Sequence, residues 1–382
     1  MHYYFIVAKV NRKISDKHRQ SIVYITLHAK QIFHQIRWPN GVKCPYCGET
    51  HIWHYKNGSY KCSHCHHTFT DTSNTVFHST KVKLEYWLIA MYLLSMAKGI
   101  SSLELSRFLQ VTQKTTWYIL HKLRAKMSQD GTFLDGDIAV DEVYLRGKWS
   151  SIIVPKKIEF MKRQGLFYPN DPKRTWSRHN IQRAISEYKQ PVFGMNDGHN
   201  IVLRALPNRF DSLDLVSLIS QHSKCVKHII SDQSSLYTDI KKQGYNVVQM
   251  NHSQHEYINN GLSSNRIEGT FSHIKRRYRC HYIRPDKKYM QLYLNEFAFR
   301  WNNRDEQTLD RLSSIMRLCV SGGRITRKDI DNYTWADSFH QRKQKKEDSI
   351  FDFKDLFDYG VVETIEINGV MYSKEDFAKL GE

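Results

Sequence analysis

Three acidic residues are spaced in a way that suits metal-dependent chemistry on phosphodiesters. Asp141 follows the apolar run Ile138-Ala139-Val140 and lies inside or near the end of a predicted strand, and Asp232 follows Ile229-Ile230-Ser231 and closes a second predicted strand. Glu268 lies in a predicted helix, with 35 residues (positions 233 to 267) between it and Asp232. Carboxylates that a fold brings together can hold two divalent ions on either side of a reacting phosphate. We therefore predict that these three acids are catalytic.

The expected cofactor of this site is Mg²⁺ or Mn²⁺. Mg²⁺ prefers oxygen ligands and keeps several waters, so two or three carboxylates are enough to hold a pair of ions. One ion activates the attacking water or 3′-hydroxyl, and the other stabilises the leaving oxygen. Taken singly, an Asp at a strand end is often a cap and a helical Glu is usually solvated. The prediction rests on the combination and its order.

Two polar residues share the predicted helix of Glu268. Lys275 follows it by seven residues, two helical turns, so both side chains project from one face. We expect Lys275 to contact DNA near the cleaved bond, with a plain surface lysine as the alternative. Asn265 lies three residues before Glu268 on the same face and is a candidate second ligand.

Four cysteines predict a structural zinc site. They form two Cys-x-x-Cys pairs with 14 residues between the pairs, at Cys44, Cys47, Cys62 and Cys65. Four thiolates at this spacing can close a tetrahedral Zn²⁺ site. The segment 52–61 predicts a strand, an Asn-Gly turn and a second strand. A redox dithiol is the weaker alternative, since two matched pairs flank a hairpin.

The next segment predicts a helical DNA-binding region. Residues 83–94 are apolar nearly all round, which indicates a buried helix, and 101–109 and 114–124 predict two shorter helices joined by a short turn. This is the helix-turn-helix pattern, although a plain helical hairpin has the same pattern. In the DNA-binding interpretation, the residues that face the major groove are Gln113, Lys114, Thr115 and Thr116.

The segment that carries the acids predicts an α/β fold. Residues 211–220 have helical periodicity, and short apolar runs predict strands at 137–145, 192–195, 201–206, 227–232 and 247–250. Three strands, a helix, a strand ending on Asp232 and a later helix with Glu268 form the order of an RNase H-like core, a mixed sheet with flanking helices.

The charge of the chain favours a polyanionic partner. Lys and Arg number 57 against 38 Asp and Glu, a formal net charge of +19. Such surfaces gain affinity from counterions released by phosphates, although charge alone also fits ribosomal or membrane-surface proteins. The sequence has neither a long apolar run nor a signal peptide, and its cysteines do not form a disulfide framework. We expect a cytoplasmic, nucleoid-associated protein without membrane contact.

Two segments depart from a minimal core. The stretch 146–190 carries eleven Lys and Arg against three acids, with aromatic residues between them, which suits phosphate contact and base stacking; a partly disordered loop is the alternative. The acidic tail 347–382 predicts an Asn-Gly hairpin at 361–372 and a short helix from Ser373, a module for a protein partner. The basic residues assigned to DNA here and beside Glu268 are Lys156, Lys157, Arg276 and Arg277.

The acidic blocks resemble those of DDE transposases. The matching blocks are Asp141-Glu142-Val143-Tyr144, Ser231-Asp232, and the run 265–276, and the run 294–304 resembles a closing block of the same family. The resemblance extends from about Ile32 to Arg304 and is closest to bacterial insertion-sequence transposases related to Merlin elements, which carry an N-terminal zinc ribbon. It implies an RNase H-like core, metal-dependent strand cleavage and transfer, and binding to terminal inverted repeats.

The resemblance leaves the third metal ligand open between Asn265 and Glu268, and the stronger affinity of a carboxylate for Mg²⁺ favours Glu268. The partners expected are double-stranded DNA, as terminal repeats and target, and a second copy of the chain on DNA. The alternatives are a transposase-derived protein that only binds DNA and an RNase H-like nuclease without strand transfer. The predicted domains are an extension (1–30), a zinc ribbon (31–75), a helix-turn-helix-like region (76–130), a catalytic domain (131–310), a helical linker (311–346) and a C-terminal module (347–382).

Overall fold

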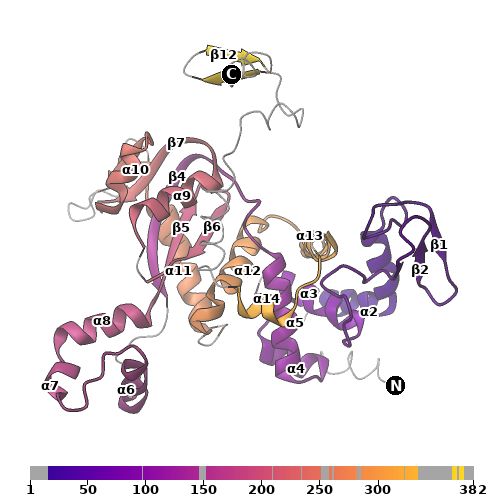
Figure 1. The fold of residues 1–382 in the computed structure, drawn as a ribbon, viewed down its shortest axis with the longest axis horizontal. Coiled ribbons are helices and arrows are strands. Elements are labelled where there is room, and N and C mark those ends of the chain that lie inside the picture. The colour runs from indigo at the N-terminus through magenta and orange to yellow at the C-terminus, as the bar shows by residue number, and fades with distance from the viewer. Residues whose placement is uncertain are drawn as a thin grey trace. The chain divides into compact units, whose positions relative to one another are not determined.

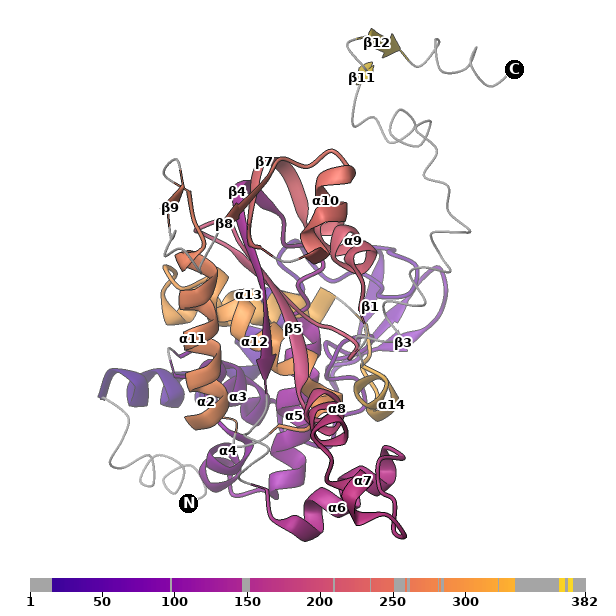
Figure 2. The ribbon, with the colours of Figure 1, turned by 90° about the vertical axis from the view of Figure 1, so that its left-hand side faces the viewer.

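The computed structural model of the protein describes residues 16–96, 98–145, 152–208, 210–233, 235–250, 258–259, 262–280, 282, 285–321, 323–333, 364–367 and 370–373. The chain divides into a large unit that ends at Trp335 and a small unit from Ala336 onward. The large unit contains a cysteine-bearing three-stranded sheet, a helical bundle and a five-stranded sheet with its helices (Figures 1 and 2).

The cysteine-bearing unit is a small antiparallel sheet. Its strands follow the order β1 (Ile52–His54), β2 (Tyr60–Cys62) and β3 (Thr68–Phe69). The predicted hairpin is confirmed: β1 pairs with β2, and Gly58 in the turn adopts a φ of 77°, which glycine tolerates. Asp71, just after β3, accepts a 2.8 Å hydrogen bond from the Trp38 indole and lies 3.2 Å from the His34 ring, so the unit is tied to the end of the first helix.

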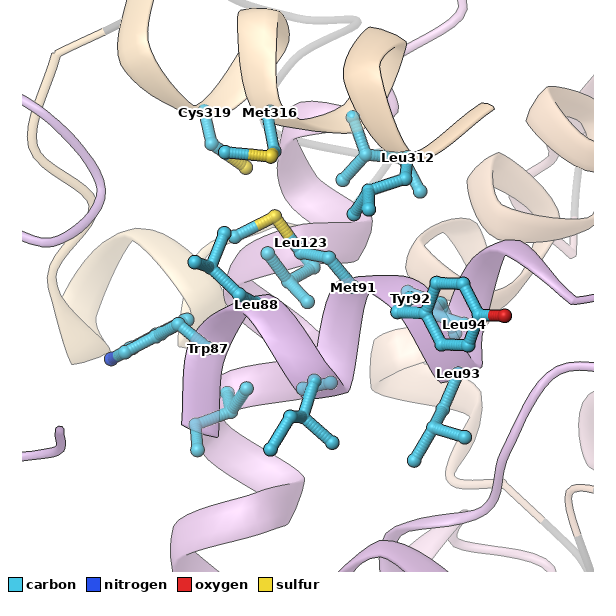
Figure 3. Packing of buried hydrophobic residues seen from close by; sticks show 14 of the residues in the cluster. Trp87, Leu88, Met91, Tyr92, Leu93, Leu94, Leu123, Leu312, Met316 and Cys319 are labelled. Atoms are coloured by element: carbon cyan, nitrogen blue, oxygen red, sulfur yellow. The ribbon is translucent and has the colours of Figure 1, made fainter. Parts of the chain in front are cut away.

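A helical bundle surrounds one central helix. Its members are α2 (Asp16–Arg37), α3 (Leu84–Ser95), α4 (Ser102–Leu109), α5 (Gln113–Lys126), α13 (Thr308–Ser321) and α14 (Arg327–Asp331). As the apolar sequence predicts, α3 is buried at every position from Trp87 to Ser95. Figure 3 shows Leu88 and Met91 of α3 in one core with Leu123 of α5 and Met316 of α13.

The chain returns to this bundle after the sheet. The segment 311–346, predicted as a helical linker, begins with residues of α13 that are buried in the bundle core. Ile330 of α14 is fully buried beside Ala125 of α5 and Leu292. Helices α13 and α14 therefore pack as part of the bundle, while 334–346 lie outside the described residues. Of the predicted N-terminal extension, the structure describes residues from Asp16 onward. These residues belong to α2, which also packs into the bundle core.

The central sheet is mixed, as predicted. Its strand order is β6 (Ile201–Ala205), β5 (Gln190–Asn196), β4 (Leu134–Leu145), β7 (Ser223–Asp232) and β8 (Val247–Met250). The first three strands pair antiparallel, while β7 runs parallel to β4 and β8 parallel to β7. All five strands expected from the sequence are present. A short ribbon of β9 (Ile258–Asn259) and β10 (Leu262–Ser263) follows.

Helices cover both faces of this sheet. The helices α11 (Asn265–Cys280) and α12 (Met290–Asn302) lie on one face, and α9 (Ser212–His222) and α10 (Thr238–Lys242) lie on the other (Figure 2). Ala139 of β4 and Ile230 of β7 share a core with Ile267 and Phe271 of α11. The side chains that alternate with Ala139 and Ile230 therefore face α9 and α10.

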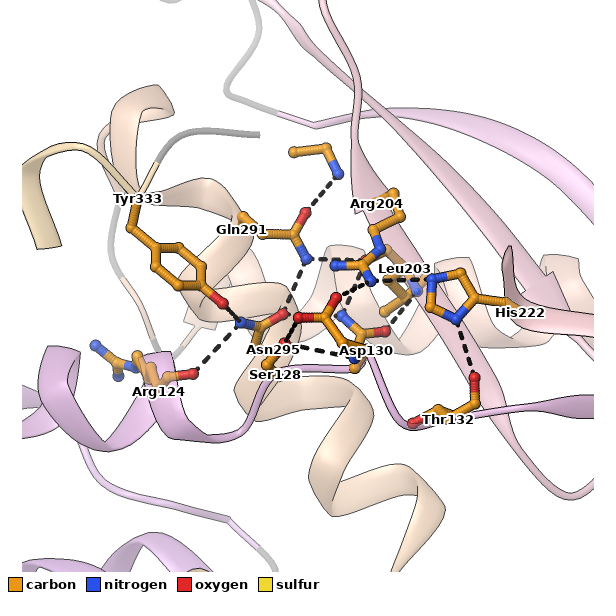
Figure 4. Close-up of polar contacts among 12 residues, drawn as sticks. Arg124, Ser128, Asp130, Thr132, Leu203, Arg204, His222, Gln291, Asn295 and Tyr333 are labelled. Carbon is orange, nitrogen blue, oxygen red and sulfur yellow. Dashed lines mark hydrogen bonds and ion pairs between the residues drawn. The ribbon is translucent and has the colours of Figure 1, made fainter. Parts of the chain in front are cut away.

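Side-chain amides cover the edge strand β6 (Figure 4). The side-chain amide of Gln129 forms two hydrogen bonds with the backbone of Leu203. Its Nε2 donates to the Leu203 carbonyl, and its Oε1 accepts from the Leu203 N–H at 2.7 Å. Gln291 of α12 accepts from Ala205, and Asn302 bonds both backbone groups of Ile201. Because these groups are satisfied, the edge is closed to pairing with another strand.

The basic stretch forms a small helical module. Its helices are α6 (Val154–Arg163), α7 (Pro172–Thr175) and α8 (Arg178–Tyr188), packed around Met161, Leu166 and Ala184. Most of its described aromatic residues pack within the module, which corrects the expectation of free stacking surfaces: Phe160 meets the Tyr188 ring, and Tyr168 lies 4.0 Å from the Arg174 guanidinium. Trp176 stays 38% exposed. Residues 146–151, with Trp149, lie outside the described residues.

The small unit contains the predicted hairpin. Its strands are β11 (Thr364–Ile367) and β12 (Val370–Ser373), paired antiparallel from Thr364↔Ser373 to Ile367↔Val370. The helix expected after Ser373 lies outside the described residues. Among the helices that the structure describes, none is both long enough and apolar enough to cross a lipid bilayer.

Candidate active site

The parallel pairing of β4 and β7 sets Asp141 and Asp232 on neighbouring strands. The pairs Asp137↔His228 and Ala139↔Ile230 keep a constant offset of 91 residues (228 − 137 and 230 − 139). The paired register ends at Ala139↔Ile230, and the same offset continued by two residues would set Asp141 opposite Asp232. Neighbouring strands lie about 4.8 Å apart. Asp141 lies two residues after Ala139, and Asp232 lies two residues after Ile230. Because side chains alternate along a strand, both acids project toward the same face as Ala139 and Ile230, the face that α11 covers.

The third acid comes from α11, which packs tightly on the sheet at Gly194. Gly194 of β5 is the Cα partner of Asp141. A Cβ atom at this glycine would lie 2.6 Å from the Phe271 ring and 2.9 Å from the Ile267 Cδ1 atom. Helix α11 therefore reaches the sheet beside Asp141, and Glu268 follows Ile267 directly.

A buried amide fixes the start of α11. Asn196 of β5 is 3% exposed and donates to the Arg266 carbonyl at 3.2 Å and to the Thr270 hydroxyl at 2.9 Å. Ser264, just before the helix, donates to Glu268 Oε1 at 3.4 Å. The first turn of α11 is thus held to β5 on both sides of Glu268.

Glu142 and Tyr237 form a pair that the sequence did not single out. Glu142 alternates with Asp141 and accepts a 2.8 Å hydrogen bond from the Tyr237 hydroxyl, just before α10. Burial is the largest cause that raises the pKa of Glu142 to about 7, and the charges of Asp141 and Asp232 raise it further. Burial also raises the pKa of Tyr237, followed by the charge of Glu142. The block Asp141-Glu142 was the sequence signal, but the tyrosine had none.

The other predicted residues of α11 are solvent-facing. Asn265, Glu268 and Lys275 are all exposed. Within the described residues, only the four cysteines form a group of three or more ligand atoms that all lie close enough to hold one metal ion. The carboxylate oxygens of the three acids do not form such a group. The structure thus sets Asp141 and Asp232 on neighbouring parallel strands and Glu268 on the adjoining helix.

The four cysteines converge as predicted. The sulfur atoms of Cys44, Cys47, Cys62 and Cys65 all lie within 4.8 Å of one another. Two of the separations, Cys44 to Cys65 and Cys47 to Cys62, are 3.5 Å. Tetrahedral Zn²⁺ with sulfur ligands at about 2.3 Å requires sulfurs about 3.8 Å apart. The donor set therefore fits a structural zinc ion.

The helix-turn-helix residues divide by exposure. Lys114 is exposed and Thr115 is half-buried in the first turn of α5. Thr116 is fully buried and donates to the Ser102 carbonyl at 2.7 Å. This corrects the prediction for Thr116, whose hydroxyl joins α5 to α4 and cannot reach a DNA groove.

The other basic candidates lie on two elements. Lys156 is exposed and Lys157 half-buried on α6, and Arg276 is exposed on α11. Arg277 donates to the Lys98 carbonyl at 2.9 Å, which links α11 to the segment after α3. These side chains do not converge on one surface element, so the structure leaves two separate basic regions.

The sequence matches two domain families. Residues 133–302 match the ISXO2-like transposase domain, and residues 27–68 match the transposase zinc-ribbon domain. The first match covers all five strands of the central sheet together with α11 and α12, and the second covers the four cysteines. Both matches coincide with structural units described above.

One curated relative is similar over part of its length. It is an uncharacterized protein in transposable element ISH50 of Halobacterium salinarum, 31% identical over 124 residues. The similarity spans 31% of this chain and 41% of the relative. With the two domain matches, it shows that this chain is similar to transposable-element proteins in two parts: a transposase zinc ribbon over residues 27–68 and an ISXO2-like transposase domain over residues 133–302.

Proposed function

We propose that the protein is a DDE transposase that binds the terminal inverted repeats of its element, cleaves the DNA there and joins the ends to target DNA. The observation that carries this proposal is the parallel register of β4 and β7 up to Ala139↔Ile230, because its continuation by two residues would bring Asp141 beside Asp232 on the face covered by α11. The ISXO2-like domain match over residues 133–302 supports it independently.

The sheet topology supports an RNase H-like core. Three antiparallel strands in sequence order, then two parallel strands that follow helices, form the order β6-β5-β4-β7-β8. We assign the catalytic domain to the sheet with α9 to α12. We assign α13 and α14 to the helical region, because their apolar side chains lie in its core.

The donor set fits the proposed Mg²⁺ or Mn²⁺ ions. Asp141, Asp232 and Glu268 offer carboxylate oxygens, which these ions prefer. When bound, such ions supply an activated nucleophile and stabilise the leaving oxygen. Asp141 and Asp232 would hold them from the sheet, and Glu268 would close the site from α11, with Asn265 one turn away. Lys275, two turns further along α11, would bind the DNA backbone near the reacting phosphate.

The DNA partner is assigned to the basic surfaces. Lys114 and Thr115 at the start of α5 are exposed or half-exposed, and Lys156 and Lys157 lie on α6. The net charge of +19 supports phosphate binding at these surfaces. We also propose that two copies act together on DNA, since an element has two ends, and that the protein resides on the nucleoid.

The test is a cleavage assay on duplexes that carry the ends of the element. Asp232→Asn should abolish Mg²⁺-dependent nicking and leave end binding nearly unchanged. Asp135→Asn is the matched control, because Asp135 is an exposed acid on β4, away from the pair. Pre-cleaved ends then separate the activities: joining to a target identifies a transposase, and hydrolysis alone identifies a nuclease. Full cleavage by the Asp232 variant would refute the site.

A further inference from the structure

A pocket lies where the helical bundle meets α11 and α12. Its volume is about 530 Å³, and its walls come from the end of α3, the second half of α11, the end of α12 and α13. This size is within the range of small-molecule sites, about 300–1,000 Å³. His273 on its wall is five residues beyond Glu268, about 7.5 Å along the helix axis.

The lining is strongly basic. Six of the ten lining residues are Lys or Arg, and none of the ten is acidic. Arg311 is 8% exposed and donates to the carbonyls of Ser95 and Asn303. Backbone carbonyls satisfy the hydrogen-bonding of a guanidinium but leave its charge uncompensated. A buried cation of this kind favours an anionic occupant.

A second buried arginine adds to this excess. Arg300 is 9% exposed and lies 3.3 Å from Glu296, but Arg124 contacts the same carboxylate at 2.7 Å. Two guanidinium groups therefore share one buried acid. Lys98 and Arg276 are exposed at the rim and extend the positive field outward.

An aromatic wall stands beside the arginines. Trp301 stacks on Phe297 with ring centroids 5.9 Å apart and meets His273 edge-on at 5.7 Å. Arg304 lies 5.6 Å from the centroid of the Trp301 ring. The indole nitrogen of Trp301 is buried, and no described residue accepts its hydrogen bond. The wall thus offers an aromatic surface beside the arginines.

We propose that this pocket holds one unpaired nucleotide of the DNA strand, with its phosphate on the arginines and its base or sugar against Trp301. The basic side chains of the lining complement a phosphate, and its aromatic side chains complement the ring surface of a base. The distance from Glu268 corresponds to about two nucleotide steps of 3.4 Å. The inference rests on the proposed function only where it assigns the nucleotide to a DNA strand. A free mononucleotide has the same phosphate and base and could contact the same side chains.

Binding without added divalent metal tests the proposal. Fluorescence anisotropy without added Mg²⁺ or Mn²⁺, and without a chelator so that the ribbon keeps its zinc, compares a hairpin duplex with a short single-stranded overhang against the same duplex with a blunt end. The wild type should prefer the overhang, and Trp301→Leu or the double variant Lys98→Gln/Arg276→Gln should reduce that preference about tenfold. Arg317→Gln is the control, because Arg317 is an exposed residue of α13 outside the pocket.

The outcomes test the proposed occupant. Equal binding of both duplexes by the wild type, or equal loss in the Arg317 variant, overturns the proposal. Excess dAMP, but not inorganic phosphate, should abolish the overhang preference, because a nucleotide is the proposed occupant; an overhang preference that excess dAMP leaves unchanged overturns the proposal. If overhang preference persists while element ends are never cleaved with Mg²⁺, the proposed function fails and the pocket stands. The double variant changes exposed side chains, so it keeps the test valid if Trp301→Leu does not fold.

Discussion

Gly194 lies directly opposite Asp141 in the sheet, and it is the absence of a side chain at Gly194 that lets α11 approach this acid. A Cβ atom there would lie 2.6 Å from the ring of Phe271, closer than real Cβ contacts. The helix that carries Glu268 is thereby seated by a glycine on another strand. This relationship makes the distance between Glu268 and Asp141 sensitive to one methyl group.

We expect Gly194→Ala to lower cleavage at least tenfold, because α11 must shift outward and take Glu268 with it. Overpacking of this kind typically costs about 1–3 kcal/mol of stability. Gly269→Ala is the control, because Gly269 is next to Glu268 on the same helix and a Cβ atom there meets nothing within 4 Å. That variant should gain up to about 1 kcal/mol from helix propensity. Cleavage rates on element ends and urea unfolding measure the activity and the stability of each variant. A Gly194→Ala variant that cleaves at the wild-type rate would contradict the role of Gly194 in positioning α11.

The identity of the third ligand can be tested on α11. Glu268→Gln should abolish Mg²⁺-dependent cleavage, since an amide oxygen binds the ion more weakly than a carboxylate. Asn265→Ala should reduce the rate by no more than about tenfold if its amide is only an auxiliary ligand. Both residues are exposed, so folding should be unaffected. Loss of activity in the Asn265 variant, with activity retained in Glu268→Gln, would reverse the assignment.

Zinc should control the folding of the ribbon alone. The ribbon core of Cys44, Tyr60, Cys62 and Phe69 is separate from the bundle core around α3. Cys62→Ser or chelation should therefore remove the bound zinc and the hydrogen-exchange protection of β1 to β3, while α3 stays protected. The control is Cys225→Ser, an exposed thiol on β7. Metal analysis reports the stoichiometry, and an unchanged ribbon without zinc contradicts a structural role.

Acid should destabilise the contact between α5 and α12 through His121. Its ring is fully buried, stacks 3.8 Å from Trp117 and contacts Tyr289 and Tyr293. Burial, followed by the charge of Arg124, lowers the pKa of His121 to about 2. In the unfolded chain His121 has a pKa of about 6.5, so as the pH falls the unfolded chain takes up the proton before the folded protein does. The contribution of His121 to the free energy of unfolding is therefore complete above about pH 6.5 and is lost as the pH falls below it.

From pH 6.5 to 5.5, His121 alone should lower the free energy of unfolding by about 1 kcal/mol. His121→Phe should remove that part of the pH dependence, whereas His199→Asn, at an exposed histidine, should keep it. Urea unfolding at several pH values measures the difference. The same pH dependence in His121→Phe and the wild type contradicts the assignment.

Local signals predicted much of the fold. The apolar runs located all five strands of the central sheet, and the uniform apolarity of residues 83–94 identified the buried helix α3. The Asn57-Gly58 turn identified the ribbon hairpin, because that dipeptide suits a tight turn. The prediction that Thr116 is exposed was wrong, because a sequence pattern of two helices does not show which side of α5 packs against α4.

By itself, the sequence determined the residue types of the two candidate sites: four cysteines at zinc-ribbon spacing, and acids in one strand, at the end of a second strand and in one helix. Only the tertiary structure decided how they meet. Alternation separates Asp141 from Glu142, but pairing with β7 and cover by α11 decided that Asp141 shares a face with Asp232 while Glu142 bonds Tyr237. The return of α13 to the bundle and the basic pocket beside Trp301 were likewise decided by contacts between segments far apart in the chain. Local periodicity fixes which side chains share a face, whereas long-range packing fixes what that face meets.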